Sequence, residues 1–288
     1  IQHLITRGMV VEDDRSIFDG EHQYHFKHNL YRDVAYKMIP RVKRQDYHRQ
    51  TALWLLERIA GATNSYPLLA EQFADSGNYL AALYTYLEAI EVQILKKQEL
   101  KALKFIDKAL SLANQVDRNE ALAVVAKLWA YRGEALITLE RYEEASAASQ
   151  SSLMLLDELS DDQLVASRIT AERILGLAYF SLGRYTDSYD ALTRAHNLLP
   201  LNATAQIASV LQAFGQLYYR QGRLQDSIAY LRRALTMANK TQDLTLIASS
   251  LVLLSQVDIE TGNLAEALAY LNDCLLYTSD AADDLLCV

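Results

Sequence analysis

The sequence predicts an all-α fold, a right-handed solenoid of helical hairpins, on three observations. Apolar residues make up 51% of the chain, which holds only three prolines and ten glycines; this composition argues against sheet-rich or disordered classes. Apolar residues recur at i, i+3, i+4 and i+7, the spacing of amphipathic helices. A six-residue phrase also recurs, which is typical of stacked hairpins. Its copies are Gly77 to Ala82, Glu140 to Ala145, Gly183 to Ser188, Gly222 to Ser227 and Gly262 to Ala267.

Residues 1–60 are expected to differ from the rest of the chain. A short amphipathic helix over residues 2–9 leads into an apolar stretch, and Asp19-Gly20 is a good tight-turn pair. Tyr24 and Phe26 then alternate with polar residues, as in a half-buried strand. The order helix, strand, loop, strand and helix predicts a small β-hairpin and the C-terminal half of a winged-helix unit, followed by connecting helices.

Small residues recur where the two helices of each hairpin must approach closely. The last residue of each phrase is small, and we call it the anchor: Ala82, Ala145, Ser188, Ser227 and Ala267. Ala102 is the anchor of an additional copy. Twelve positions before three of these anchors stand Gly133, Gly176 and Gly215, and nine positions before two of them stand Tyr179 and Tyr218. A side chain at the glycines would push the helices apart, so we predict helix contacts there.

The anchors at 145, 188, 227 and 267 predict an array of five to six hairpins over residues 61–273. Their spacings of 43, 39 and 40 residues should lengthen the helices or the loops, such as 158–163 and 239–243. One long helix over about 79–96 would be both the second helix of one hairpin and the first helix of the next. Trp129 lies sixteen residues before the anchor Ala145, and Pro200 lies twelve residues after the anchor Ser188. With these positions the pattern resembles the tetratricopeptide repeat (TPR), whose usual unit is about 34 residues.

A second resemblance covers the stretch from Tyr24 to Tyr36 and its basic continuation through His48-Arg49. It resembles the junction of STAND-type signal-transduction ATPases, particularly bacterial proteins that join a nucleotide cyclase, an AAA-like ATPase, a winged helix and a TPR array. The resemblance implies that an upstream ATPase domain of the same parent chain is a partner. The positions that carry it are Phe26, His28, Arg32, Asp33, Ala35 and Tyr36.

The C-terminal segment departs from the repeat pattern, and the N-terminus begins within a helix-like pattern. Residues 274–288 (CLLYTSDAADDLLCV) leave the repeat pattern and resemble a translated transposase-derived sequencing adapter; a genuine acidic tail is the alternative. Both cysteines lie there, so we infer no disulfide or thiol chemistry. The chain begins at Ile1 inside an amphipathic pattern, and we expect its natural start upstream.

Catalytic motifs are missing from the sequence. It contains no G-x-x-x-x-G-K-[ST], G-x-G-x-x-G, H-E-x-x-H or G-x-S-x-G, so we predict no catalytic residue, no cofactor and no enzyme activity in this chain. A metal site at His22, His25 and His28 is disfavoured, because on a strand His25 points away from the other two.

Charge and hydropathy narrow the class of partner. Residues 1–60 hold ten Lys and Arg against eight Asp and Glu, and the rest of the chain is more acidic, with eighteen against twenty-eight. This negative charge disfavours nucleic acid or an anionic membrane as the partner of the repeat region. We expect no apolar run of about 18 to 20 residues and a cytoplasmic location. A basic cluster at Arg41, Lys43, Arg44 and Arg49 indicates a solvated face or an interdomain contact rather than DNA binding.

These observations favour a non-catalytic, regulatory protein-interaction fragment. Its array would bind a protein or peptide and bias the nucleotide-bound state of the upstream ATPase. The alternatives are a stand-alone adaptor or scaffold and the sensor region of a transcription regulator.

Overall fold

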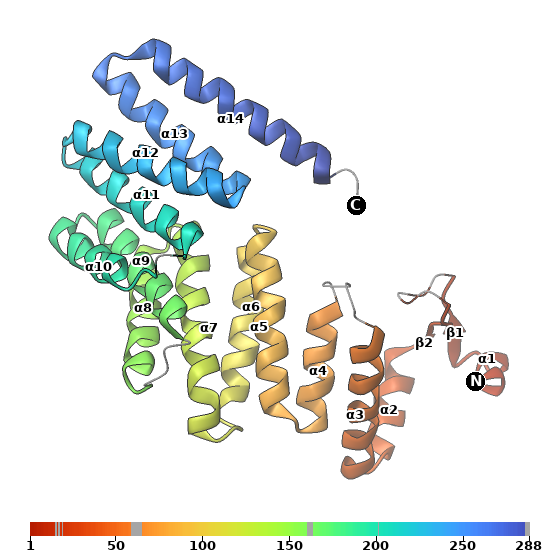
Figure 1. The fold of residues 1–288 in the computed structure, drawn as a ribbon. Coiled ribbons are helices and arrows are strands. Elements are labelled where there is room, and N and C mark those ends of the chain that lie inside the picture. Colours follow the sequence, from red (N-terminus) through yellow and green to blue (C-terminus); the bar gives the residue numbers. More distant parts are fainter. Residues whose placement is uncertain are drawn as a thin grey trace. The chain divides into compact units, whose positions relative to one another are not determined.

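The computed structural model describes residues 1–14, 16, 18, 20–58, 65–159, 164–200 and 202–285, with side chains as far as Leu275. Within these residues the chain forms fourteen helices and one two-stranded sheet (Figure 1). The predicted all-α, TPR-like helical-hairpin fold is confirmed. The chain divides into two compact units, Ile1–Ala121 and Leu122–Val288. This division differs from the predicted boundary at residue 60, which stays a prediction.

The first unit opens with the predicted β-hairpin. Helix α1 (Gln2–Thr6) precedes strands β1 (Val10–Glu12) and β2 (Tyr24–Phe26), which pair antiparallel with Val10 opposite Phe26. The prediction of a helix over residues 2–9 was too long. Gly8 takes a left-handed φ of 65° and donates its N–H to Ile5 O, which ends the helix early.

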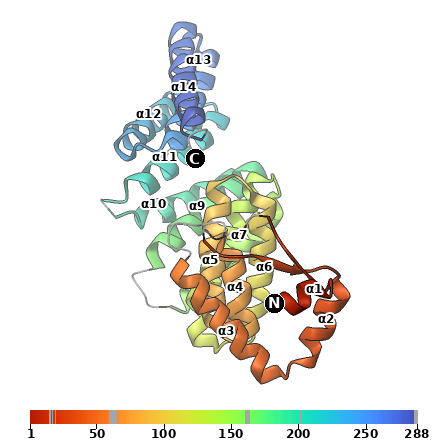
Figure 2. The ribbon, with the colours of Figure 1, turned by 90° about the vertical axis from the view of Figure 1, so that its right-hand side faces the viewer.

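Five longer helices complete the first unit. They are α2 (Asn29–Met38), α3 (Arg41–Arg58), α4 (Tyr66–Ser76), α5 (Tyr79–Leu95) and α6 (Glu99–Ala113). Helix α3 packs on α4, α4 packs on α5 and α5 packs on α6, and these helices lie side by side in Figure 2. Because α5 contacts both α4 and α6, it serves two hairpins, as predicted for residues 79–96.

The second unit is built from four hairpins. Their helices are α7 (Arg118–Thr138, whose first residues precede the boundary), α8 (Tyr142–Asp157), α9 (Val165–Ser181), α10 (Tyr185–Asn197), α11 (Thr204–Arg220), α12 (Leu224–Thr241), α13 (Leu244–Thr261) and α14 (Leu264–Leu285). Helix α11 contacts α9 and α13 as well as its own partner α12. The first helices of successive hairpins therefore line a common face.

The extra residues of the long repeats lie mainly in helices. Residues 239–241, predicted to be in a loop, instead continue α12 to Thr241. Asp243 then begins the next helix, because its carboxylate accepts the backbone N–H groups of Thr245 and Leu246 at 3.0 and 3.1 Å. Of the other predicted loop, 158–163, residues 160–163 lie outside the described residues.

The small residues sit where helices meet. A Cβ added to Gly176 would lie 2.7 Å from Leu192 Cδ2, and one added to Gly215 would lie 2.5 Å from Leu231 Cδ2. Ser227 Oγ donates to the carbonyl of Gly215 at 2.8 Å, which joins α12 to α11. At Gly133 the nearest atom would be Ser149 Oγ, at 2.8 Å. The phrase-final residues are at most 1% exposed: Ala82, Ala102, Ala145, Ser188, Ser227 and Ala267.

An arginine in the second position of the phrase makes a repeated set of contacts. Arg184 lies over the ring of Tyr179, 4.1 Å from its centroid, and pairs with Asp187 at 2.7 Å. Arg223 makes the same contacts with Tyr218 and Asp226, at 4.3 and 2.7 Å. In the last copy Asn263 replaces the arginine and the buried Asp258 replaces the tyrosine. The Asn263 side-chain amide donates to Asp258 Oδ1 at 3.5 Å, so the two replacing residues contact each other.

Helix α13 departs from the expectation about apolar runs. Within the described part of the chain it alone is long and apolar enough to span a membrane by length and composition, with 18 residues and a mean hydropathy of 1.3. It packs between α12 and α14. Its buried residues Ile247, Leu251, Leu254 and Val257 belong to clusters shared with neighbouring helices, so hairpin packing accounts for its composition.

The segment that resembles an adapter begins inside α14. The helix continues to Leu285, past the last repeat-like residue. Cys274 packs beside Ile247 and Leu251, and its Sγ lies 3.8 Å from the carbonyl oxygen of Ala248. The adapter origin of residues 274–288 stays a prediction.

Candidate functional site

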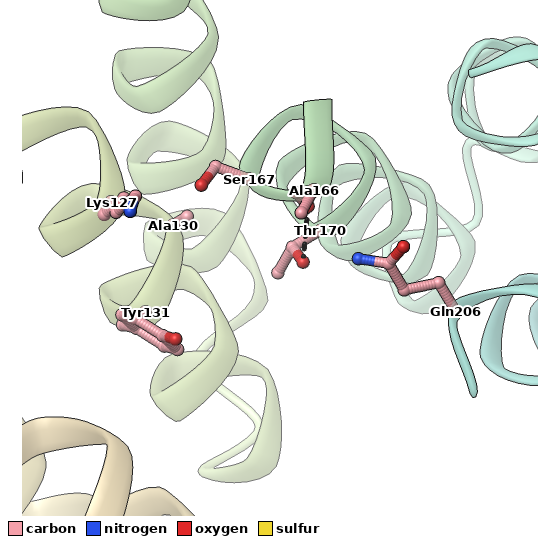
Figure 3. A pocket seen from close by; sticks show the side chains of 7 residues that line it. All are labelled: Lys127, Ala130, Tyr131, Ala166, Ser167, Thr170 and Gln206. Atoms are coloured by element: carbon pink, nitrogen blue, oxygen red, sulfur yellow. Dashed lines mark hydrogen bonds between the residues drawn. The ribbon is translucent and has the colours of Figure 1, made fainter. Parts of the chain in front are cut away.

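A groove of about 170 Å³ lies on the face made by the first helices of the second unit (Figure 3). Helices α7, α9 and α11 each contribute to it, so three successive hairpins share one surface. The lining residues are Lys127, Ala130 and Tyr131 from α7, Ala166, Ser167 and Thr170 from α9, and Gln206 from α11. We call this surface the inner groove.

The inner groove offers polar groups that are available to a ligand. Within the described residues, the Lys127 ammonium makes no ion pair and the Gln206 side-chain amide makes no hydrogen bond. Thr170 Oγ1 donates to Ala166 O at 3.0 Å, and its oxygen can still accept. The alanines at 130 and 166 leave room for a backbone to approach closely. These are the groups that an extended peptide needs.

Contacts between the first helices hold this surface in place. Arg173 pairs with Glu134 at 3.5 Å, from α9 to α7, about one helical turn beyond the groove. From α11 to α13, Gln212 Nε2 donates to Leu246 O at 3.0 Å and to Ser250 Oγ at 2.6 Å. Gln212 and Ser250 are buried. A surface fixed in this way loses little conformational freedom when a ligand binds.

None of the repeat positions selected from the sequence lines the inner groove. They are buried between helices, including Tyr179 and Tyr218, which are 8% and 6% exposed. Their structural effect is to set the spacing of the helices that carry the groove residues. The sequence did contain a signal for the groove: polar residues spaced three or four apart on first helices, as at Lys127, Tyr131 and Glu134.

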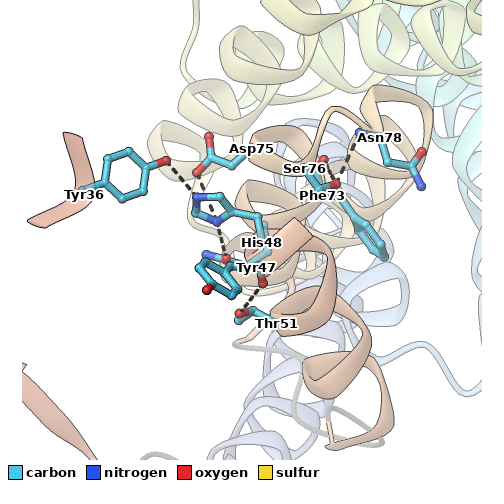
Figure 4. Close-up of polar contacts among 9 residues, drawn as sticks. Tyr36, Tyr47, His48, Thr51, Phe73, Asp75, Ser76 and Asn78 are labelled. Atoms are coloured by element: carbon cyan, nitrogen blue, oxygen red, sulfur yellow. Dashed lines mark hydrogen bonds and ion pairs between the residues drawn. The ribbon is translucent and has the colours of Figure 1, made fainter. Parts of the chain in front are cut away.

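In the first unit, Tyr36 of the junction joins a network around His48 (Figure 4). The Tyr36 hydroxyl lies 2.8 Å from His48 Nε2, and His48 Nδ1 lies 2.8 Å from Gln72 Oε1. Because a carbonyl oxygen only accepts, Nδ1 carries a proton, and in the neutral ring Nε2 then accepts from the tyrosine. Arg44 stacks over the Tyr36 ring at 4.7 Å. The network ties α2 and α3 to α4.

The other junction positions stay close to the hairpin and α2. Phe26 lies in β2, and His28 precedes α2 with its ring against Tyr31, 5.4 Å between centroids. Arg32 and Asp33 are exposed and pair with each other at 2.8 Å. Ala35 is half-buried on α2. Of the six junction positions, only Tyr36 takes part in the His48 network.

The histidines at positions 22, 25 and 28 do not converge on one point. His22 Nδ1 lies 2.6 Å from Glu12 Oε1, whereas His25 Nδ1 lies 2.8 Å from Asp13 Oδ1. His28 is at the start of α2. Across the described ranges, no three or more His, Cys, Asp or Glu side chains are grouped to hold a metal ion.

The basic cluster is partly engaged within the chain. Arg49 pairs with Asp46 at 2.7 Å, and this hydrogen bond lowers the pKa of the Asp46 carboxyl. The Arg44 guanidinium stacks over the Tyr36 ring.

Comparison with known proteins supports the repeat assignment. Residues 167–240 and 206–275 match the tetratricopeptide repeat. The two matches together run from within α9 to within α14, and TPR arrays are protein-interaction scaffolds. No curated protein matches the sequence significantly.

Solved structures share the fold at low sequence identity. BtubC from P. vanneervenii is 16% identical, with a TM-score of 0.58 over 79% of this chain and 92% of its own. A Rap protein complexed with competence and sporulation factor is 12% identical, with a TM-score of 0.64, over 89% and 71%.

A third similar structure is a STAND protein with a tetratricopeptide repeat sensor from Pyrococcus horikoshii. It is 15% identical, with a TM-score of 0.52 over 96% of this chain. The chain spans 45% of that protein. At these identities the likeness establishes the helical-hairpin fold.

Proposed function

We propose that this chain is a peptide-binding sensor module whose inner groove takes an extended segment of a partner. The observation that carries the proposal is the groove itself, to which α7, α9 and α11 each present polar side chains. Lys127 and Gln206 offer hydrogen-bond donors, and the Thr170 hydroxyl offers an acceptor. The TPR match and the Rap protein seen with its factor support a peptide ligand.

A pair of matched threonines tests the groove. Thr170 lies in the groove on α9 and Thr236 lies exposed on the second helix α12, and each donates its hydroxyl to the carbonyl four residues earlier. Peptides would be selected from a displayed library of unstructured sequences against the full chain. Affinities would then be measured by calorimetry for the wild type, Thr170→Trp and Thr236→Trp.

We expect Thr170→Trp to weaken the selected peptides about tenfold or more, equivalent to about 1.4 kcal/mol, because the indole fills the groove. Thr236→Trp should leave the affinity unchanged, and melting curves confirm that both variants fold. Selected peptides that bind Thr170→Trp as tightly as wild type would place the site elsewhere. A library that yields no specific binder would also count against the proposal.

We further propose that the module belongs to a larger STAND-type ATPase, in which it passes the binding signal to a nucleotide switch. Support comes from the junction residues, from the STAND neighbour, whose match includes nearly the whole of this chain, and from the His48 network. Through Tyr36, that network connects the segment after the β-hairpin to α4. The winged-helix assignment of residues 1–60 is part of this proposal.

The genomic sequence on both sides of the chain tests the parent protein. We expect an upstream reading frame that encodes a phosphate-binding G-x-x-x-x-G-K-[ST] loop. A helix-turn-helix in its place would support a transcription regulator, and a short flank would support a stand-alone adaptor. Either result would overturn the ATPase proposal and leave the groove proposal to its own test.

A further inference from the structure

A second hollow lies in the first unit, far along the sequence from the inner groove. It measures about 250 Å³ and is formed by α4 and α6 with one residue of α5. Pockets for drug-sized ligands usually span about 300–1,000 Å³, so this volume suits a single side-chain-sized group. Its lining residues are Glu71, Ala74, Asp75, Tyr86, Lys108, Ser111 and Leu112. We call it the α4–α6 pocket.

Tyr86 of α5 presents an unpaired hydroxyl to the α4–α6 pocket. The residue is 2% exposed, and its ring packs near Phe105, with 6.3 Å between centroids. The described residues give its hydroxyl no hydrogen-bond partner. Burial, together with the charges of Glu71 and Asp75, raises its pKa to about 12. The phenol is therefore neutral near pH 7, and its unpaired hydroxyl is available to a group that enters the pocket.

The charges around Tyr86 leave one carboxylate uncompensated. Glu71 pairs with Lys108 at 2.5 Å, which neutralises both. Asp75 has a side chain that is 56% exposed, and its nearest basic group is His48 Nδ1 at 3.9 Å. That histidine is already occupied, because its two ring nitrogens hydrogen-bond Gln72 and Tyr36. The pocket therefore keeps a net negative charge at Asp75.

Ser111 adds another hydrogen-bond acceptor to the α4–α6 pocket. Ser111 Oγ donates its proton to Lys108 O at 2.6 Å, so its oxygen is left to accept. The pocket thus combines an anionic acceptor at Asp75 with hydroxyl oxygens at Tyr86 and Ser111. An anion would be repelled, and an apolar group would desolvate these atoms without replacing their hydrogen bonds.

We propose that the α4–α6 pocket binds an alkylguanidinium or alkylammonium group, with Asp75 as the counter-charge and the Tyr86 hydroxyl as an acceptor. A guanidinium carries five N–H donors in a planar fork, which suits several acceptors around one small volume. The group is either an arginine or lysine side chain of a peptide or a free amine such as agmatine or spermidine. This site lies in another unit from the inner groove and does not depend on the function proposed there.

Calorimetric titration of the full chain tests the site with four probes: a blocked Gly-Arg-Gly peptide, the same peptide with neutral citrulline, agmatine and spermidine. We expect the citrulline peptide to bind at least about tenfold more weakly than the arginine peptide, because it lacks the charge. Tighter binding of the arginine peptide than of the free amines identifies a peptide side chain as the source. The reverse order identifies a free amine. Equal binding of the arginine and citrulline peptides overturns the proposal.

Three variants separate the pocket from general charge effects. Asp75→Asn and Tyr86→Phe should each weaken the preferred cation about tenfold, since each removes an acceptor from a charged donor. Glu88→Gln is the matched control, because it removes one negative charge at an exposed position of α5 outside the pocket. It should change the affinity less than about twofold. Equal losses for Asp75→Asn and Glu88→Gln would overturn the proposal. Thr170→Trp should have no effect on this binding, which keeps the two sites distinguishable.

Discussion

Replacing Ala145 by leucine tests the packing register of the second unit. Ala145 is fully buried on α8, and its carbonyl oxygen would lie 3.4 Å from a Cβ added to Gly133 on α7. Since even that one added carbon would lie 2.8 Å from Ser149 Oγ, the two helices leave no space for extra atoms between them. Leucine adds three carbons at this position, and they must displace neighbouring atoms.

The magnitude follows from two opposing terms. Burying three additional carbons would stabilise the fold by about 2.4 kcal/mol if space were present. Because none is present, overpacking dominates and the net loss is about 1–3 kcal/mol. Glu143→Leu changes an exposed residue two positions away on the same helix and should alter stability by no more than about 0.5 kcal/mol. A loss of 1 kcal/mol lowers Tm by about 2–4 °C for a unit of this size.

Thermal unfolding followed by far-UV circular dichroism compares the variants. We expect Ala145→Leu to melt about 2–12 °C below wild type, with Glu143→Leu close to wild type. Ala145→Ser should be tolerated, because Ser227 at the equivalent position donates to Gly215 O at 2.8 Å. Equal Tm values for the two leucine variants would refute the proposed register.

Three further variants test other features. Asp258 is fully buried with one oxygen lacking a hydrogen-bond partner, so Asp258→Leu should raise the free energy of unfolding in urea by about 1–3 kcal/mol; a decrease would contradict this account. Glu140 adopts a φ of 58° where the other phrases have glycine, and Glu140→Gly should stabilise the fold by about 0.5–1 kcal/mol in the same assay; an unchanged or lower free energy of unfolding would contradict the strain. The pKa of Tyr86 is about 12 in the folded state against an ordinary 10. Its contribution to the free energy of unfolding is therefore constant below pH 10 and is lost as the pH rises towards 12. Tyr86→Phe should make the stability fall less steeply over that range, and an unchanged slope would show that the phenol titrates normally.

The packing of the array could be predicted from the sequence because close helix contacts restrict residue size. Gly176 opposite Leu192 and Ser227 opposite Gly215 tolerate little else, so the contacts leave a pattern that a single sequence displays. The length of α1 was overestimated, because the amphipathic pattern runs past Gly8 while the backbone turns there.

The sites could not be predicted in the same way. Lys127, Thr170 and Gln206 lie about one repeat apart in the sequence and meet only after three hairpins stack. Solvent-facing positions also carry no packing constraint, so no motif marks them. The α4–α6 pocket combines the Tyr86 hydroxyl with the Asp75 carboxylate from a different helix, and sequence spacing alone does not reveal that the two lie close together.

The central claim is that a peptide binds across the first helices of the second unit. Hydrogen–deuterium exchange of the full chain, with and without a library-selected peptide, tests it most directly because exchange reports local opening along the chain. We predict that the peptide slows exchange in α7, α9 and α11 around the inner groove, while the second helices α8, α10 and α12 change little. Slowing confined to α8, α10 and α12, or to the first unit, would contradict the claim.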